Sequence, residues 1–276
     1  MTLEEMKISV ITPVFNGAGM IKYCMGSVDA QSYRNKEHVI VDGLSSDDTV
    51  TVINNNKAGY VKLLSEKDTG LYDAFNKGIR LATGDIICFL SADDMYAHEH
   101  VLESVADTFL MNPGAGMVYG DIVYVNRDDL SSVVRYWKSC PFKPGLFRKG
   151  WMAPNTALFI RKEMFDKFGF FDVRYRMAAD YELQFRLFEK HLLKSVYFPG
   201  VLVRMRSGGV SNSSLGNMYK SLRECHNALS QHHVSNRLLY IINTIFYRIR
   251  QKSIPAEIKR LNERQALQMA GLSTCH

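Results

Sequence analysis

Two adjacent acidic residues, Asp93 and Asp94, follow an apolar stretch over residues 85–90 that has the composition of a buried strand. Like charges at neighbouring positions repel each other, and neither carboxylate can enter a core without a partner. Paired carboxylates at a strand end suit a hard divalent cation such as Mg²⁺ or Mn²⁺, which takes few protein ligands when a diphosphate supplies the others. A solvent-exposed turn explains the same two residues without any ligand, because acids are common in turns.

A second set of polar residues shares one face of a predicted helix. Asp73, Asn76 and Lys77 stand three and four positions apart within residues 71–82, so they lie side by side on that helix. The lysine suits a phosphate group or an acid, and a plain surface ion pair with Asp73 explains it as well.

Asp180 opens the helix predicted over residues 180–190. An aspartate at this position commonly caps a helix N-terminus. It can also act as a general base that takes a proton from a hydroxyl group. The two roles are compatible, and the sequence leaves both open.

Several common cofactor and metal motifs are missing from the sequence. It has no Walker A motif and no GxGxxG, which the segment Asn16-Gly17-Ala18-Gly19 only half resembles. The first predicted strand ends in TPVFN, which does not fit the phosphatases that need DxDxT there. The five cysteines are scattered and form no CxxC pair, which argues against a disulfide framework or a thiolate zinc site and indicates a reducing compartment.

Strand and helix patterns alternate along residues 7–125. The predicted strands cover residues 7–14, 38–43, 61–66, 85–90 and 117–125, with helices at 20–32, 47–56, 71–82 and 98–111. This alternation predicts an α/β fold with a parallel sheet and helices on both faces. Because ligands bind outside the carboxyl ends of such strands, we expect Asn16, Asp42 and the Asp93–Asp94 pair to gather along one edge.

The alternation breaks after residue 125. Residues 135–148 contain aromatic residues and prolines and predict an irregular crossing segment. A further strand is expected over 156–160, the helix already mentioned over 180–190, and an extended segment over 195–203. Residues 206–217 are rich in Gly, Ser and Asn, which indicates a mobile loop or lid, and helices follow it.

The formal net charge of +6 belongs to the C-terminal part of the chain. Residues 215–276 contain nine Lys and Arg and three acids, whereas the charges of residues 1–214 balance. A basic segment mixed with Leu, Ile, Phe and Tyr predicts a surface for anionic lipid or for a partner helix, which includes a second copy of the chain. We expect no nucleic-acid partner, since a nucleic-acid-binding domain usually carries its positive patch on the folded body.

No signal-peptide pattern opens the chain, and the apolar stretch 238–247 is too short to span a bilayer.

Taken in order, the motifs resemble those of the family 2 glycosyltransferases. They read ISVITPVFN, VIVDGLSSDDT, EKDTGLYDAFNKGI, TGDIICFLSADD, FGFFD and AADYELQFRL, and the resemblance covers residues 7 to about 210. It implies the GT-A fold, a mostly parallel Rossmann-like sheet flanked by helices, here with a C-terminal helical tail. The implied organisation is a catalytic domain over 1–214, with a nucleotide-sugar half to about 125 and an acceptor half over 126–214, followed by a basic helical tail over 215–276.

The resemblance also implies roles for residues of the first two strands. Pro13 and Phe15 would lie near the nucleobase of a nucleotide-sugar donor, and Asn16 would join them in the donor site. Asp42 would accept a hydrogen bond from the base.

Further roles follow for the later motifs. The helix that carries Asp73, Asn76 and Lys77 would line the donor pocket. Asp93 would face the ribose or the sugar, and Asp94 would bind a divalent metal, Mn²⁺ or Mg²⁺. A cation that bridges these acids to a diphosphate would explain why they end a buried strand.

The acceptor side is less regular. Asp180 would be the catalytic base. Asn155 is the expected acceptor-side contact. Here the chain departs from the family pattern, because many relatives carry His-Gln before the strand at 156–160, where this chain has Pro154-Asn155-Thr156. Arg206 would reach the diphosphate from the lid.

These roles predict an inverting glycosyltransferase that moves a sugar, of UDP-hexose type, to a glycan or lipid-linked oligosaccharide in surface polysaccharide synthesis. The basic tail would hold it as a peripheral protein at the cytoplasmic face of the plasma membrane. One alternative is a sugar-1-phosphate nucleotidyltransferase, which needs Arg and Lys in a Gly-rich loop after the first strand, where this chain supplies only Lys22. The other is a non-catalytic nucleotide-sugar-binding or scaffolding protein.

Overall fold

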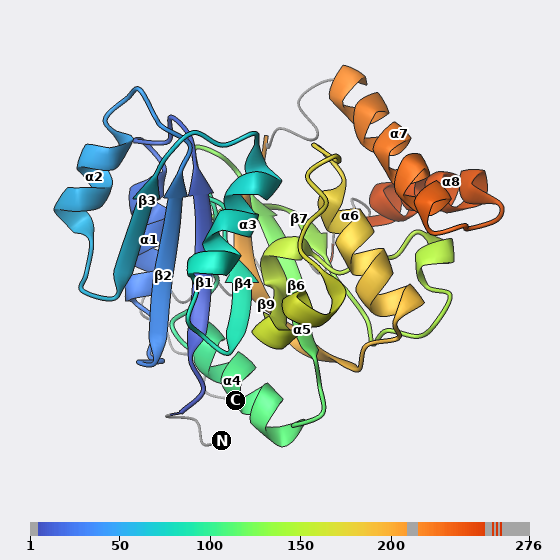
Figure 1. The fold of residues 1–276 in the computed structure, drawn as a ribbon, viewed down its shortest axis with the longest axis horizontal. Helices are drawn as coiled ribbons and strands as arrows, with labels where there is room; N and C mark the ends of the chain where they lie inside the picture. The colour runs from blue at the N-terminus through green and yellow to red at the C-terminus, as the bar shows by residue number, and fades with distance from the viewer. Residues whose placement is uncertain (1–4, 209–214, 252–255, 257, 259, 261–276) are drawn as a thin grey trace.

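The computed structural model describes residues 5–208, 215–251, 256, 258 and 260, which form a nine-stranded sheet between layers of helices (Figure 1). The strands are β1 (Ile8–Val14), β2 (Lys36–Asp42), β3 (Val61–Ser65), β4 (Ile86–Phe89), β5 (Met95–Tyr96), β6 (Met117–Val125), β7 (Val133–Trp137), β8 (Leu158–Arg161) and β9 (Ser195–Arg206). The helices are α1 (Ile21–Asp29), α2 (Thr49–Asn56), α3 (Leu71–Leu81), α4 (Val101–Met111), α5 (Lys162–Phe168), α6 (Ala179–Gln184), α7 (Leu215–Gln231) and α8 (Arg237–Gln251). Short 3₁₀ turns are η1 (Phe147–Lys149) and η2 (Asn155–Ala157), and η3 (Phe185–Lys190) is a π-helical continuation of α6.

The sheet has the strand order β3-β2-β1-β4-β8-β6-β9-β5, with β7 beside β6. Strands β1 to β4, β6 and β9 run in one direction, and β5, β7 and β8 run against them. The predicted α/β fold with a mostly parallel sheet is therefore confirmed. The carboxyl ends of the parallel strands meet at one edge, which is the upper edge in Figure 1.

Alternate side chains along the strands pack into two core layers, one on each face of the sheet. On β1, Val10 and Val14 pack with α1, α2 and α4, whereas Ile11 packs on the opposite face with α3, α5 and α6. This period of two is what a strand covered on both faces requires. The second layer places α3 and α6, the helices predicted to carry site residues, on the same face of the sheet (Figure 1).

Three strand features were not foreseen. The strand predicted near 156–160 is β8, and it enters antiparallel between β4 and β6. The segment expected to be irregular begins with β7, which pairs with β6. The two-residue strand β5 pairs with β9 directly after the acidic pair.

The C-terminal helices α7 and α8 pack into the layer that contains α6. Cys225, Ala228, Leu229 and Ile241 are buried there. A Cβ atom on Gly150 would lie 2.3 Å from the backbone of Asn243, so α8 approaches η1 as closely as only glycine permits. The predicted boundary at 214/215 is therefore not marked by any break in packing among the described residues. No helix in the described part of the chain is long and apolar enough to cross a bilayer.

A buried carboxylate fastens the opposite edge of the sheet. Glu37 is 2% exposed, accepts hydrogen bonds from Ser9 and Thr83, and forms ion pairs with Lys7 at 3.0 Å and Lys62 at 2.9 Å. Burial opposes its ionisation, but these contacts prevail and hold the pKa of Glu37 below its usual value. It therefore joins β1, β2, β3 and the turn before β4.

We expect Glu37→Gln to lower the free energy of unfolding at pH 7 by about 2 kcal/mol, the size of a hydrogen bond to a buried charge. Because the folded-state pKa is lowered, the stabilisation is complete above the unfolded-state pKa and is lost as the pH falls through the folded-state value. Urea unfolding at pH 7 and pH 3.5 should show the difference shrinking at the lower pH. The exposed Glu103→Gln is the control, and an equal loss in both variants would contradict the role given to Glu37.

Candidate active site

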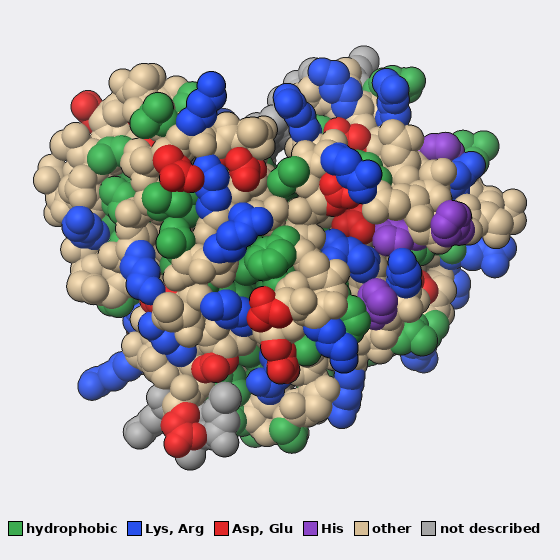
Figure 2. All heavy atoms as spheres, viewed as in Figure 1, with side chains coloured by type: hydrophobic (Ala, Val, Ile, Leu, Met, Phe, Trp, Pro, Cys, Tyr) green, Lys and Arg blue, Asp and Glu red, His purple; other side chains and the backbone are tan. Residues whose placement is uncertain are grey.

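The residues predicted to do chemistry lie at the carboxyl edge. Val14 of β1 is in register with Asp42 of β2, and Ile11 is in register with Phe89 of β4, which leads to Asp93 and Asp94. In the space-filling view the molecule is hollowed at this edge, between the part that carries α2 and the part that carries α7 (Figure 2).

Asp94 is fully buried at this edge. Its Oδ1 accepts a hydrogen bond from the backbone N–H of Arg206 at 3.2 Å, and its buried Oδ2 has no hydrogen-bond partner among the described residues. Burial, and then the charge of Asp93, raise the pKa of Asp94 well above its usual value. A buried carboxylate oxygen without a hydrogen-bond partner is energetically costly, so the described protein groups alone do not satisfy the Asp94 side chain.

Arg206 lies beside Asp93 and Asp94, in a position that differs from the prediction. It is the last residue of β9 and only 6% exposed, so it does not belong to a lid. Its Nε donates to the carbonyl of Asp93 at 3.1 Å, its Nη1 donates to the carbonyl of Arg127 at 2.9 Å, and its guanidinium lies 4.6 Å from the ring centre of Tyr23. Its Nη2 is buried without a described partner. Most of the predicted lid falls outside the described residues.

Among the described residues, one carboxylate, that of Asp94, has a free oxygen that fits a divalent cation. Within the part of the chain that the structure describes, no three His, Cys, Asp or Glu side chains could hold a metal together. Asp42 and Asp180 accept hydrogen bonds from protein groups, so the structure does not bring them to a shared ion with Asp94. The free Oδ2 of Asp94 suits a cation whose other ligands are waters and phosphate oxygens, and such a cation would favour the ionised carboxylate.

The end of β1 forms a small polar junction. Pro13 is buried within the strand, and Phe15 is 66% exposed beyond it. Asn16 has φ = 50°, a left-handed conformation that Asn tolerates better than most residues. Its Oδ1 accepts from the Ser46 N–H at 2.9 Å, which ties the loop after β1 to the loop after β2.

Asp42 is not free to meet a ligand in this structure. Its side chain is fully buried and accepts hydrogen bonds from the Ser45 N–H at 3.1 Å, the Ser45 hydroxyl, and the Ser65 hydroxyl at 2.6 Å. The carboxylate thus holds the ends of β2 and β3 together, which differs from the predicted contact with a base.

Asp68 lies at the same strand ends and was not singled out from the sequence. A Cβ atom on Gly43 would lie 2.6 Å from Oδ2 of Asp68 and 3.4 Å from Cδ2 of Phe15, so the three residues meet at the strand ends. Oδ1 of Asp68 accepts from the N–H of Gly70, just before α3. The signal was the motif EKDTGLYDAFNKGI, of which only Asp73, Asn76 and Lys77 were singled out.

The three predicted residues of α3 have different surroundings. Asp73 accepts from the Thr69 N–H at 2.9 Å, ahead of the helix. Lys77 forms an ion pair with Glu66 at 2.8 Å, which raises the pKa of Lys77. Asn76 is buried, and its amide exchanges two hydrogen bonds with the backbone of Phe171, at 2.9 and 3.0 Å. The structure therefore gives Asn76 a fastening role instead of the predicted donor contact.

Asp180 lies in the first turn of α6 and contacts α3. Its Oδ1 accepts from the hydroxyl of Tyr72 at 2.9 Å and from the N–H of Tyr181 at 2.9 Å. Burial, and then the nearby Asp180, raise the pKa of Tyr72 well above its usual value, so this hydroxyl stays protonated and donates. Tyr72 was not singled out from the sequence, yet it links the predicted base to the helix after β3.

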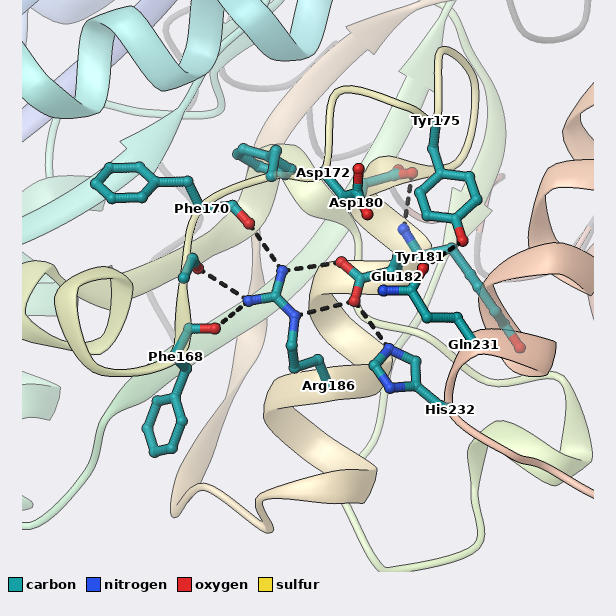
Figure 3. A network of polar contacts seen from close by, with 12 residues as sticks. Phe168, Phe170, Asp172, Tyr175, Asp180, Tyr181, Glu182, Arg186, Gln231 and His232 are labelled. Atoms are coloured by element: carbon teal, nitrogen blue, oxygen red, sulfur yellow. Dashed lines mark hydrogen bonds and ion pairs between the residues drawn. The ribbon is translucent and has the colours of Figure 1, made fainter.

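A charged network holds α6 in place (Figure 3). Glu182 is 1% exposed and binds the Arg186 guanidinium through both oxygens, at 2.9 and 2.8 Å, while its Oε1 also meets Nε2 of His232 at 2.8 Å. Arg186 donates in addition to the carbonyls of Phe168, Gly169 and Phe170. The network joins α6, the segment before it and the end of α7.

Asn155 lies in η2, directly before β8. Because β8 is antiparallel to β4, η2 is at the same edge as Asp94, and it packs beside β4, β6 and β9. The side-chain oxygens of Asn155 and Thr156 are buried without partners among the described residues. These acceptors remain available to a ligand hydroxyl.

The mostly parallel α/β sheet with helices on both faces and polar groups at its carboxyl edge is the GT-A fold. The family model described as glycosyl transferase family 2 matches residues 9–171. The chain belongs to this family and is a glycosyltransferase.

Two curated relatives illustrate the similarity. A "PGL/p-HBAD biosynthesis glycosyltransferase" of Mycobacterium bovis is 31% identical over 209 residues, which is 74% of this chain and 79% of the relative. An uncharacterized glycosyltransferase of Mycobacterium tuberculosis is 33% identical over 181 residues, 65% of this chain and 68% of the relative.

Solved structures share the fold at low identity. Staphylococcus aureus TarS 1–349 has a TM-score of 0.60 at 16% identity, over 88% of this chain and 71% of that one. A mannosyltransferase of Pyrobaculum calidifontis, solved with GDP-Man and Mn²⁺, has a TM-score of 0.61 at 16% identity, over 98% and 76% of the two chains. TarS has also been solved with UDP-GlcNAc.

We expect Tyr72→Phe to lower kcat for sugar transfer about tenfold, the value of one hydrogen bond that holds Asp180, the predicted base, and to change the donor KM less than about twofold. Steady-state transfer kinetics would measure both. Tyr60→Phe is the matched control, because the Tyr60 hydroxyl also donates to a carboxylate, that of Asp29 at 2.6 Å, near the opposite edge of the sheet. A similar fall in kcat for both variants would show that the loss is not specific to Asp180.

Proposed function

We propose that this glycosyltransferase transfers a hexose from a UDP-sugar to a glycan or lipid-linked acceptor, with inversion at the anomeric carbon. The observation that carries the proposal is the hydrogen bond between Tyr72 and Asp180. It brings a carboxylate from the later part of the chain to the helix after β3, at the edge that also holds the buried Asp94 and Arg206. The donor half would end near residue 125, and the acceptor half would begin there.

The chemistry assigned to the chain is a single displacement. Asp180 takes the proton of an acceptor hydroxyl while that oxygen forms a bond to the anomeric carbon. The bond from this carbon to the diphosphate oxygen breaks at the same time, and its electron pair leaves with the nucleoside diphosphate. Because attack and departure occur on opposite faces, the configuration inverts.

The leaving diphosphate needs positive charge. We assign this to Arg206, whose buried Nη2 is without a described partner, and to a divalent cation held by Asp94. A bound Mn²⁺ or Mg²⁺ supplies Lewis-acid stabilisation of the leaving group. The Mn²⁺ in the Pyrobaculum structure supports the choice of a divalent ion.

We assign the remaining donor contacts to the strand ends. Phe15, with Asp68 and Gly43 beside it, is the proposed face for the nucleobase, and Pro13, Asn16 and Asp42 hold that face in shape. The UDP-GlcNAc in the TarS structure supports a uridine donor. Asp93, Asp73 and Lys77 are proposed to line the sugar and phosphate side, and Asn155 the acceptor side.

Donor hydrolysis and transfer should be screened over a panel of nucleotide sugars with Mn²⁺ and with EDTA. We expect turnover with one donor, loss of activity with EDTA, and a fall of at least about a hundredfold in Asp180→Asn, the usual contribution of a general base. Asp94→Asn should abolish the response to Mn²⁺, whereas the exposed Asp166→Asn should behave as wild type.

Full activity in EDTA would remove the metal from the proposal. An unchanged rate in Asp180→Asn would favour a nucleotide-sugar-binding role, and release of diphosphate from a nucleoside triphosphate would indicate a nucleotidyltransferase.

We also propose that α8 holds the enzyme on an anionic membrane, at the inner face of the plasma membrane. One side of α8 exposes large apolar residues, each at least 37% accessible: Leu238, Leu239, Ile242, Ile245, Phe246 and Ile249. The sequence from 225 to 256 contains Arg237, Arg248, Arg250 and Lys252 and no acid. An apolar helix face within a stretch of sequence that is basic and free of acids matches a surface of anionic lipid.

Vesicle sedimentation would test α8. Wild type should bind phosphatidylglycerol vesicles at low salt and bind phosphatidylcholine vesicles weakly, and high salt should weaken the first interaction. Phe246→Ser with Ile249→Ser should lower the bound fraction at least about fivefold, while Met111→Ser, at an exposed apolar residue of α4, should not. Failure of wild type to bind anionic vesicles removes the membrane proposal, and a dimer lost in the α8 variant would assign this face to a second copy.

A further inference from the structure

An open cavity of about 370 Å³ lies between the segment before α6 and the helix α7. Its lining combines three basic residues with polar ones: Arg174, Tyr175, Lys220, Arg223, Glu224 and Asn227. This volume is enough for a phosphate or diphosphate group with part of its substituent. In the space-filling view, Lys and Arg side chains gather over α7 and the loop before α6, in the upper right, around a few acidic side chains (Figure 2).

Two of the basic lining residues, one lysine and one arginine, lie on α7. Lys220 and Arg223 are exposed, stand three positions apart on one face of the helix, and make no ion pair or side-chain hydrogen bond with any residue that the structure describes. Arg174 is instead held by Asp172, with its Nε 2.9 Å from Oδ1. The cavity therefore presents two free cations beside one that is already paired.

Glu224, the acid in the lining, forms no ion pair with Lys220 or Arg223 in the described part of the chain. Oε2 of Glu224 accepts hydrogen bonds from the N–H groups of Met177 at 2.7 Å and Ala178 at 3.1 Å. This carboxylate is committed to the backbone just before α6. The Tyr175 hydroxyl donates to Gln231 at 2.8 Å, which fixes the other wall (Figure 3).

The same contacts place the cavity next to the proposed base. Glu224 holds Met177 and Ala178, and Asp180 follows them in the first turn of α6. The donor diphosphate is assigned to Asp94 and Arg206, on other elements of the fold. A group bound by Lys220 and Arg223 therefore approaches Asp180 from the α7 side, which is the side left for the acceptor.

We propose that this cavity binds a phosphate or diphosphate group carried by the acceptor, so that an acceptor hydroxyl is presented to Asp180. The inference rests on the proposed function, because it uses Asp180 as the base. Lysine and arginine that are not already in an ion pair are the residues that recognise such groups. The acceptor class is then an anionic glycan or a lipid-linked phosphate or diphosphate.

Binding of inorganic diphosphate to the full chain, measured by calorimetry in EDTA, is the first test. Lys220→Gln with Arg223→Gln should raise the Kd about tenfold, since two charge-assisted contacts are lost. Arg148→Gln with Lys149→Gln removes the same charges from an exposed turn elsewhere and should leave the Kd unchanged. Equal Kd values for wild type and the α7 variant overturn the proposal.

Two further measurements distinguish the sources of the phosphate group, and distinguish failure of this proposal from failure of the proposed function. Binding of phosphatidylglycerol vesicles should be nearly the same in the α7 variant and in wild type; loss of vesicle binding with unchanged diphosphate affinity would mean that these cations contact lipid headgroups, and would overturn the acceptor assignment. Donor hydrolysis should also be unchanged in the α7 variant. If wild type hydrolyses no nucleotide sugar, the proposed function fails while the diphosphate result still reports on the cavity.

Discussion

The hydrogen-bonded register of β1 between β2 and β4 is the constraint on which the site depends. It sets Val14 beside Asp42 and Ile11 beside Phe89, so three loops leave the sheet at one level. Strand β9 runs the same way and delivers Arg206 to that level. A slip of one residue in any of these pairings would turn the buried side chains toward the wrong core layer, so packing enforces the alignment of the polar ends.

Much of this arrangement was readable from local pattern. Alternating strands and helices gave the sheet, and the rule that parallel strands present their carboxyl ends together gave the edge. What the sequence did not reveal are partners far apart in the chain. Asn76 bonds to Phe171 and Asp94 to Arg206, across 95 and 112 residues. Periodicity reports which face of an element is buried, and it carries no information on which distant group will satisfy a given polar atom.

The remaining differences have the same origin. Asp42 was expected to face a ligand because it ends a strand, yet Ser45 and Ser65 satisfy it inside the protein. A strand as short as β5 has too few residues to show any period. The charge of the C-terminal segment suggested a separate tail, but charge does not report packing, and the helical spacing of Cys225, Ala228 and Leu229 brings α7 into the core.

The two hydrogen bonds between the Asn76 amide and the Phe171 backbone limit which segments can follow residue 171. The family match ends at Phe171, the residue whose backbone this amide holds. After that point the chain forms α6, then β9, which returns to the sheet between β6 and β5 and brings Arg206 to the site edge, and then α7. A segment that replaced the residues beyond Phe171 would therefore have to offer one N–H and one carbonyl to the Asn76 amide and also supply a strand between β6 and β5.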